Sequence, residues 1–286
     1  MTSSGDVCWL IDSYMLDLSK DRGCGSIAEA VSRLGMNVCV ISSEQAPLRN
    51  LELPDWSDRC VVVYGSFRFV RQVQRAASPA YCPGAFADIP NLSYAAFGSR
   101  HGNLLLNDDF VILPFGEFRR RGLAPWGGRC FLRPSAVTKS FTGMVVTAPD
   151  FTVEMNALER LHHVMPEDLV VAARARGIEK ETRFVVVDGQ VVSGSTYGWN
   201  GNDDIGHPMD EASIDLARRV AADPWQADRA YTCDVALVRD GDRLVARLIE
   251  LNSFSCASLY ACDLDAVVRA VSAAALDEWQ QGYAAL

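Results

Sequence analysis

Three oxygen-bearing side chains lie on an expected hairpin and are the first candidates for chemistry. Residues 231–252 read YTCDVALVRDGDRLVARLIELN, with Asp234 in the first strand and Glu250 and Asn252 closing the second. Side chains alternate between the two faces of a strand, so Glu250 and Asn252 point the same way. Their oxygens suit Mg²⁺ or Mn²⁺ and not Zn²⁺. Both acids have apolar neighbours, which favours a metal or a charged partner over the alternative, a solvated strand face.

The loop of this hairpin decides whether Asp234 shares that face. A two-residue turn at the Asp240-Gly241 dipeptide would put Asp234 on the face opposite to Glu250. A three-residue loop at 239–241 would instead pair Asp234 with Ala246, on the same face as Glu250. The metal hypothesis therefore predicts the three-residue loop.

A second group of residues could bind an anion. Residues 129–146 read RCFLRPSAVTKSFTGMVV, a strand, a loop and a returning strand. Arg133 would end the first strand and supply a rigid fork of donors. The loop offers a mobile cation, two hydroxyls and a glycine, whose backbone could close over phosphates: Lys139, Ser140, Thr142 and Gly143. It is not a Walker loop, and taken alone a surface hairpin explains it better.

Three further segments remain open in meaning. Glu181 and Arg183 share one face of a strand, where they could bind ribose and phosphate or form an exposed pair of little energetic value. The polar segment 193–204, with Ser195 and Tyr197, is a substrate loop or a disordered surface loop. Residues 253–260 follow the metal residues directly. They line an acceptor site, through Ser253 and Tyr260, or begin a helix.

Composition limits the class of protein and its compartment. The chain has 286 residues, 49% of them hydrophobic, and a net charge of -9, which allows a large core and disfavours a nucleic-acid groove. We find no secretory signal and no apolar run of about 18 residues, so we expect a cytoplasmic protein without membrane contact. Nine cysteines without C-x-x-C spacing indicate reduced core residues. A nucleophilic cysteine with His162 or His163 as base is the less favoured alternative.

The elements that must position these residues change in character along the chain. Apolar strands are expected at 7–11, 37–42 and 60–64, with a helix at 26–34 that ends at Gly35. This pattern predicts a parallel α/β layer, in which Gly65-Ser66 follows a strand as a ligand-binding turn or a plain one. We expect residues 78–104 to be an irregular connection between domains.

The second part predicts an antiparallel α+β layer. Two Asp-Gly dipeptides, at 188–189 and 240–241, are strong hairpin signals. Helices are expected at 153–162, 211–221 and 261–279. The expected strands are at 129–133, 144–147, 169–173, 184–187, 190–193, 231–238 and 244–251.

Taken in order, these segments resemble the ATP-grasp superfamily. The resemblance rests on FLRP and KSFTG between Phe131 and Gly143, on E-x-R (Glu181, Arg183), on the strand acid Asp234 and on E-x-N (Glu250, Asn252). It covers residues 104–286, and residues 1–103 look like the small α/β domain that precedes this fold. The implied fold class is therefore α/β plus α+β, a pre-ATP-grasp domain followed by two α+β lobes. Arg133 stands where many members have lysine, which resembles a bacterial and phage clade.

The resemblance implies a site between the two lobes. Adenine would meet the backbone near Ala172, Ala173 and Arg174, and Glu181 would hold the ribose. Phosphates would contact Arg133, Lys139, Ser140, Thr142, Gly143 and Arg183, of which the three cations would act in catalysis. Mg²⁺ or Mn²⁺ would bind Asp234, Glu250 and Asn252. Ser195, Tyr197, Ser253 and Tyr260 would contact substrate.

The implied activity is ATP-dependent amide formation between a carboxylate and an amine. The carboxylate becomes an acylphosphate, and the amine then displaces phosphate, with positioning and electrostatics as the protein's main contribution. The substrates would be small molecules, such as an amino acid or a short peptide, and the resemblance implies a homodimer. A phosphotransferase that stops at phosphate transfer, and a nucleotide-binding or interaction protein without turnover, are the alternatives.

Overall fold

A parallel sheet forms the N-terminal part of this computed structural model, which describes residues 6–42, 52–77, 80–138, 140–199 and 201–283. Its strand order is β2-β1-β3-β4, and all neighbouring strands are parallel, as the sequence predicts. The strands are β1 (Val7–Asp12), β2 (Asn37–Ile41), β3 (Cys60–Tyr64) and β4 (Cys82–Gly84). The helices of this part are α1 (Ser13–Asp21), α2 (Ile27–Arg33) and α3 (Phe67–Ala77).

Local sequence explains where α2 begins and ends. The Ser26 hydroxyl accepts a hydrogen bond from the amide of Glu29, which satisfies one of the free N–H groups of the first turn. Gly35 follows with φ of 74°, a left-handed conformation that glycine adopts without strain. The Ser66 hydroxyl after β3 binds Asp12, so Gly65-Ser66 forms a tightly packed turn.

The segment 78–104 is more regular than the sequence suggests. Its described part contains β4 and the helix α4 (Tyr94–His101), whose first turn is held by the Ser93 side chain. The prediction of an irregular connection is wrong here, because the Pro, Gly and Ser residues flank short elements and do not interrupt them. The aromatic rings of α4 pack into the centre of the molecule.

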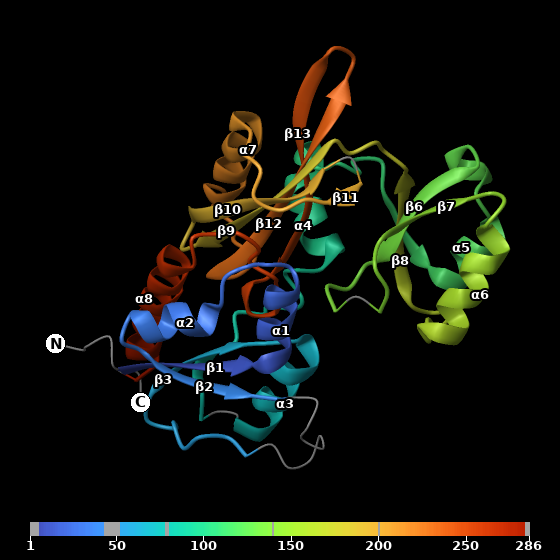
Figure 1. The fold of residues 1–286 in the computed structure, drawn as a ribbon. Coiled ribbons are helices and arrows are strands. Elements are labelled where there is room, and N and C mark those ends of the chain that lie inside the picture. The colour runs from blue at the N-terminus through green and yellow to red at the C-terminus, as the bar shows by residue number, and fades with distance from the viewer. Residues whose placement is uncertain (1–5, 43–51, 78–79, 139, 200, 284–286) are drawn as a thin grey trace.

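An antiparallel sheet of order β11-β10-β9-β12-β13 forms the middle of the molecule (Figure 1). Asp188 and Gly189 have positive φ and join β9 to β10 in the expected two-residue turn. The bounds are β9 (Lys180–Val187), β10 (Gln190–Trp199), β11 (Asn202–Asp203), β12 (Ala230–Asp240) and β13 (Arg243–Ser253), with α7 (Glu211–Ala221) on one face and the 3-10 helix η4 (Phe254–Cys256) after the last strand.

Alternation along β9 decides what each face of this sheet does. Phe184 and Val186 point to the face that α7 covers, within a buried apolar cluster. Val185 and Val187 point to the opposite face and pack with the C-terminal helix α8 (Leu264–Tyr283) and the parallel sheet. Arg183 shares that second face, beyond the part that α8 covers. The two sheets and α8 therefore share one core.

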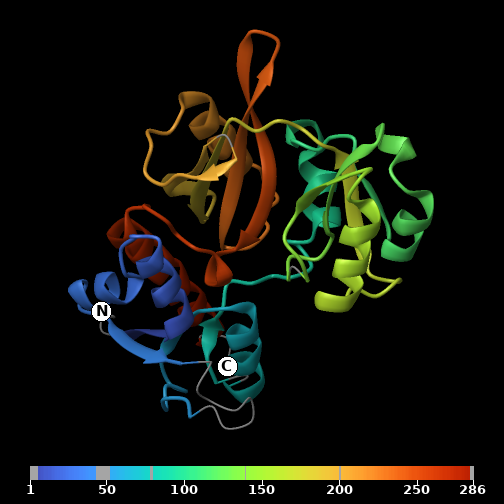
Figure 2. The ribbon, with the colours of Figure 1, turned by 45° about the vertical axis from the view of Figure 1, so that its right-hand side comes forward.

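A third sheet of order β5-β8-β6-β7 forms a small lobe (Figure 2). It packs with its helices around its own apolar cluster, drawn from residues 113–172. The other face of β8 contributes Val171 to the cluster that holds α4. The bounds are β5 (Val111–Pro114), α5 (Phe115–Arg121), β6 (Arg129–Pro134), β7 (Met144–Thr147), α6 (Phe151–Leu161) and β8 (Leu169–Arg174). Among the described helices of the chain, none is both long and apolar enough to cross a membrane.

Candidate active site

Asp234 and Glu250 lie directly opposite each other on β12 and β13. The hairpin turn consists of Gly241 and Asp242, so neither loop considered from the sequence is correct. From this turn a regular ladder would pair Asp234 with Ile249 and put Glu250 on the other face. A β-bulge at Ile249 shifts the register by one residue. The bulge, and not a three-residue loop, places both acids on one face.

Arg183 holds Asp234 in a buried two-pronged ion pair. Nε and Nη2 of Arg183 each donate to one oxygen of Asp234 at 2.7 Å, and the two residues are 7% and 1% exposed. Asn252 Nδ2 donates to the same carboxylate at 3.2 Å. Burial alone would lower the pKa of Arg183, but the charge and hydrogen bonds of Asp234 raise it well above its ordinary value. Arg183 is therefore a permanent cation.

Arg133 and Glu250 form a second buried pair beside the first. Nη2 of Arg133 lies 2.6 Å from Oε2 of Glu250, and both side chains are less than a tenth exposed. The guanidinium also lies 5.3 Å from the ring centroid of Tyr94 on α4. Two cations and two acids from four strands thus form one charged cluster at the junction of the small lobe and the central sheet.

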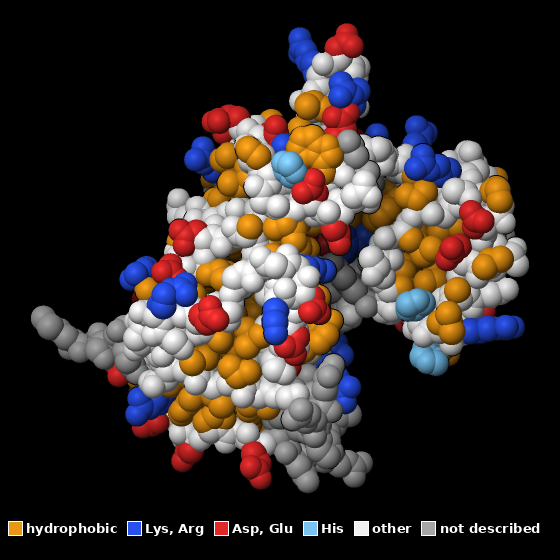
Figure 3. Space-filling model, viewed as in Figure 1, with side chains coloured by type: hydrophobic (Ala, Val, Ile, Leu, Met, Phe, Trp, Pro, Cys, Tyr) orange, Lys and Arg blue, Asp and Glu red, His pale blue; other side chains and the backbone are white. Residues whose placement is uncertain are grey.

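A cavity of about 510 Å³ opens beside this cluster, between the small lobe and the central sheet. In the space-filling view the small lobe is a separate bulge, joined to the body below the projecting β12–β13 hairpin (Figure 3). Both lobes and the hinge between them supply the lining: Leu106, Asn107, Phe131, Arg133, Pro134, Phe141, Thr142, Gly143, Met144, Val145, Arg176, Ile178, Glu181, Tyr197, Gly201, Ile249 and Glu250. Apolar side chains around a few charged groups are typical of a small-molecule site.

Glu181 supplies an acceptor in the cavity wall. The Tyr197 hydroxyl donates to Glu181 Oε2 at 2.9 Å. Burial raises the pKa of Glu181, and this hydrogen bond works in the opposite direction by favouring the ionised form. Burial and the neighbouring acids raise the pKa of Tyr197 well above its ordinary value, so its hydroxyl stays a donor.

Comparison with protein families gives a decisive match. Residues 70–271 match a model described as an ATP-grasp domain, family 3 of its clade, and this match spans well over half of the chain. The chain belongs to this ATP-grasp family. The sequence resemblance is thereby confirmed, as is the mixed fold with its two lobes.

Solved ATP-grasp structures are similar in fold, although distant in sequence. D-cycloserine synthetase DcsG matches with a TM-score of 0.63 and 15% identity, over 94% of this chain and 99% of that one. ATP-grasp ligase PsnB, complexed with a phosphomimetic variant of its minimal precursor, Mg and ADP, gives 0.58 and 13%, over 96% and 100%. D-alanine–D-alanine ligase from Bacillus anthracis, complexed with ATP, gives 0.57 and 11%, over 96% and 99%. A comparison with curated proteins gives no match.

Several expected nucleotide contacts lie elsewhere in this ATP-grasp structure. Ala172 and Ala173 are fully buried in β8, which is hydrogen-bonded to β5 and β6 on its two sides, and do not line the cavity. Arg174 points to solvent and pairs with Asp109. The hinge residues in the lining are Arg176 and Ile178, because β8 runs on to residue 174 before the chain crosses to the central sheet.

The expected phosphate loop is partly placed. Thr142 and Gly143 line the cavity, whereas Ser140 is exposed and outside its lining. Lys139 lies outside the described residues. A Cβ on Gly143 would come within 2.9 Å of the Phe131 ring, so glycine is required for this close approach.

The expected substrate residues divide into two kinds. Ser195 and Ser253 are buried, and their hydroxyls bind the backbone of Thr196 and Phe86, so they hold the fold together. Tyr197 lines the cavity, and Tyr260 stacks on it with ring centroids 4.8 Å apart. The segment 193–204 is not a loop in its described part, because β10 continues to Trp199 and turns into β11.

The sequence missed the apolar lining and the ring below Arg133. Phe131 is two residues before Arg133 on β6, so strand alternation puts both on the cavity face. Ile249 enters the lining through the bulge next to Glu250. Tyr94 had no signal, because it comes from a segment interpreted as irregular.

The donor set fits a metal that arrives with phosphates. Within the described ranges, no group of three or more His, Cys, Asp and Glu side chains is placed to hold an ion. Asp234, Glu250 and the Asn252 amide offer oxygen donors on one face. Mg²⁺ is usually held by one or two carboxylates together with substrate phosphates and water, which agrees with this set.

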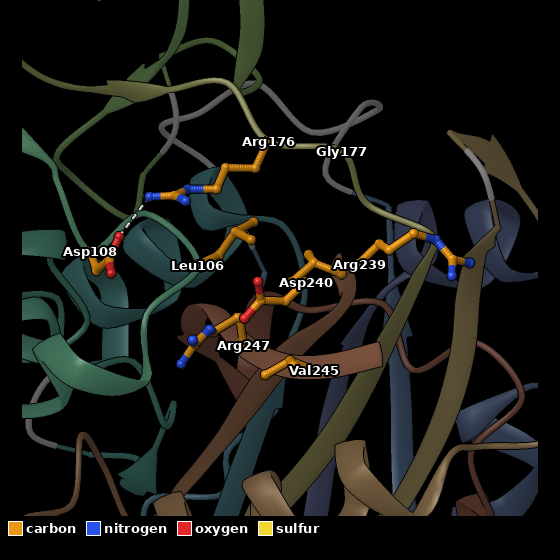
Figure 4. Close-up of a pocket in the computed structure, with 9 residues that line it drawn as sticks. Leu106, Asp108, Arg176, Gly177, Arg239, Asp240, Val245 and Arg247 are labelled. Carbon is orange, nitrogen blue, oxygen red and sulfur yellow. Dashed lines mark hydrogen bonds and ion pairs between the residues drawn. The ribbon is translucent and has the colours of Figure 1, made fainter. Parts of the chain in front are cut away.

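A smaller cavity of about 290 Å³ lies behind the hinge and shares Leu106 and Arg176 with the larger one (Figure 4). Arg176 pairs with Asp108 at 2.7 Å, which ties the hinge to the strand-like segment beside β13. Asp240 and Arg247 project from the hairpin into the same space. These exposed pairs orient the hinge but add little stability.

Proposed function

We propose that this chain is an ATP-dependent carboxylate–amine ligase. The observation that carries the proposal is the cluster of Arg183–Asp234 and Arg133–Glu250 at one wall of the cavity between the lobes. Such a cluster places two fixed cations next to two metal-binding acids, which is what phosphoryl transfer from a nucleotide needs. Membership of the ATP-grasp family supports the same interpretation.

The cavity would hold the nucleotide with its base toward the hinge. Phe131, Val145 and Ile178 offer an apolar surface from both lobes, and Glu181 could accept hydrogen bonds from ribose hydroxyls. Arg133, Arg183 and the loop of Thr142 and Gly143 would bind phosphates, with Lys139 as a further cation. We propose residues 104–286 as the catalytic unit and 1–103 as a flanking domain on the substrate side.

Asp234, Glu250 and Asn252 would hold Mg²⁺, which neutralises charge on the phosphates when bound. Charge that develops on the transferring phosphoryl group would meet the guanidinium of Arg133 and of Arg183. Both are held in place before the reaction, so little reorganisation is needed. The protein excludes water through the small lobe and its loop, which protects the activated acid.

The reaction we propose has two steps. A carboxylate oxygen of the first substrate attacks the γ-phosphorus, the bond to the β-γ bridging oxygen breaks, and ADP leaves. The nitrogen of an amine then attacks the acyl carbon of the acylphosphate, the C–O bond to phosphate breaks, and the amine loses a proton. The products are an amide, ADP and phosphate.

Thermal unfolding with and without Mg-ATP tests the nucleotide site. A ligand at a hundred times its Kd stabilises the fold by about 2.7 kcal/mol. For a chain of this length that corresponds to a rise in Tm of about 4–5 °C. We expect the shift in the wild type and in Asp242→Asn, an exposed acid on the same hairpin, but a much smaller one in Glu250→Gln. No shift in any of the three would remove the basis of the proposal.

ADP release then separates the ligase from its alternatives. Release that requires both a carboxylate and an amine indicates a ligase, whereas release with one acceptor and no amine indicates a phosphotransferase. Binding of Mg-ATP without any release over a broad panel of acceptors would favour the non-catalytic protein.

A further inference from the structure

Arg22 brings a cation from the N-terminal sheet to the candidate active site. It caps the end of α1, and its Nη1 donates to the Ser258 hydroxyl at 3.0 Å. Arg183 Nη1 donates to the backbone oxygen of the same Ser258 at 2.9 Å. Two guanidinium groups from different parts of the chain thus meet at one residue, as the proximity of α1 to the segment after β13 in Figures 1 and 2 also shows.

A pair of stacked tyrosines forms the wall beside these cations. The rings of Tyr197 and Tyr260 are nearly parallel, with an interplanar angle of 6°. Arg22 lies 5.3 Å and Arg183 5.2 Å from the centroid of Tyr260. The ring therefore separates the Arg22 guanidinium from the cavity wall by the width of one side chain.

The backbone here is held in a strained shape. Tyr260 has φ of 50°, in the left-handed region that bulky side chains rarely adopt. The amide of Ala261 donates to Ser195 Oγ at 3.2 Å and that of Asp263 to Ser193 Oγ at 2.8 Å, which fix the segment to β10. Strain held by such surrounding bonds is typical of ligand-binding positions.

The charges of the two arginines differ in an important respect. Asp234 neutralises Arg183 through two hydrogen bonds. Arg22 is exposed, and the ion pairs formed within the described part of the chain give it no carboxylate partner. The surplus positive charge, with the Ser258 hydroxyl next to it, suits a small anionic group with the planar fork of a carboxylate.

We infer that Arg22 is a specificity-determining residue that binds the carboxylate of an amino acid, the amine substrate of the ligase. This rests on the proposed function. The amino acid's carboxylate lies between Arg22 and the Ser258 hydroxyl, against Tyr260, and does not react. Its amino group is directed toward Arg183 and the metal-binding acids. The N-terminal sheet thereby selects the second substrate, while the two lobes bind the nucleotide.

The test uses thermal unfolding of the full chain in saturating Mg-ADP, with each of the twenty common L-amino acids and D-alanine added singly. We expect at least one amino acid to raise Tm and its carboxamide analogue to have no effect. Arg22→Ala should weaken that amino acid's binding about 10- to 100-fold, as expected for loss of a charged hydrogen bond. Arg22→Lys should restore part of it, and the Mg-ADP shift should be unchanged in both variants.

Lys20→Ala is the matched control, because it removes an exposed cation from the same helix. It should bind amino acid and nucleotide like the wild type. Equal binding of an amino acid and its amide, or unchanged affinity in Arg22→Ala, would overturn the inference. So would a wild type that responds to Mg-ADP but to no amino acid. A wild type that does not respond to Mg-ADP overturns the proposed function, and this inference with it.

Discussion

Removing Asp234 tests how the charged cluster is built. Asp234→Ala would leave the Arg183 guanidinium 7% exposed and without its two 2.7 Å hydrogen bonds. Breaking one side of a buried ion pair costs about 3–5 kcal/mol, because the remaining charge is desolvated and uncompensated. Arg183 keeps its bond to the Ser258 carbonyl and its contacts with two tyrosine rings, so we expect about 3 kcal/mol.

The double variant Arg183→Met with Asp234→Ala separates this explanation from simple loss of packing. Without the buried cation the penalty disappears, so the double variant should be more stable than Asp234→Ala alone. It should also show no Tm shift with Mg-ATP, since it lacks a phosphate-binding cation and a metal-binding acid. Equilibrium unfolding in urea measures the free energies of unfolding.

Glu179→Ala is the control for this experiment. Glu179 also pairs with an arginine, Arg239, at 2.7 Å, but that pair is exposed. Its loss should cost under about 1 kcal/mol. If Asp234→Ala costs no more than Glu179→Ala, or the double variant is less stable than Asp234→Ala by the sum of two single losses, the account of the cluster is wrong.

Three further changes test the cavity and the pH response. Tyr197→Phe removes the hydrogen bond to Glu181, so the pKa of Glu181 should rise further and the Kd of Mg-ATP should increase about 3- to 10-fold, with a smaller change for 2′,3′-dideoxy-ATP, measured by titration calorimetry. Gly143→Ala should weaken nucleotide binding because its Cβ would collide with the cavity wall, whereas Gly177→Ala at the hinge, with nothing within 4 Å, should leave binding unchanged. Burial raises the pKa of Asp228 from 3.8 to about 6, so its contribution destabilises the fold as pH rises from about 4 to 6, and urea unfolding should show Asp228→Asn gaining stability relative to the wild type by about 1–3 kcal/mol at pH 7.5 but not at pH 4; equal effects at both pH values would contradict this.

Much of the fold could be predicted because periodicity and turn chemistry act locally. The runs at 60–64 and 144–147 became β3 and β7 with the expected bounds, and 211–221 became α7. The Asp188-Gly189 turn followed from the need for positive φ at both residues. Helix α4 was missed because its stability comes from aromatic packing in the core, which local composition does not reveal.

The site could be predicted in its residue types but not in its pairings. Arg183, Glu181 and Thr142 lie in or beside one cavity, as the order of the motifs suggested. That Arg183 would bind Asp234, and Arg133 would bind Glu250, depends on how two sheets meet. Such contacts join residues more than fifty positions apart, and no short pattern encodes them.

The register of β12 and β13 shows most clearly where sequence reasoning fails and why. Counting from the turn gives Asp234 opposite Ile249, on the wrong face, yet the requirement that two acids share one face gave the correct arrangement. The difference is a single bulged residue, which adds one position to β13 and reverses the alternation beyond it. Turn rules describe the end of the hairpin where the chain reverses, whereas the bulge lies next to the acids that need it. A chemical constraint on which side chains must face each other was therefore a better guide to register than the geometry of the turn.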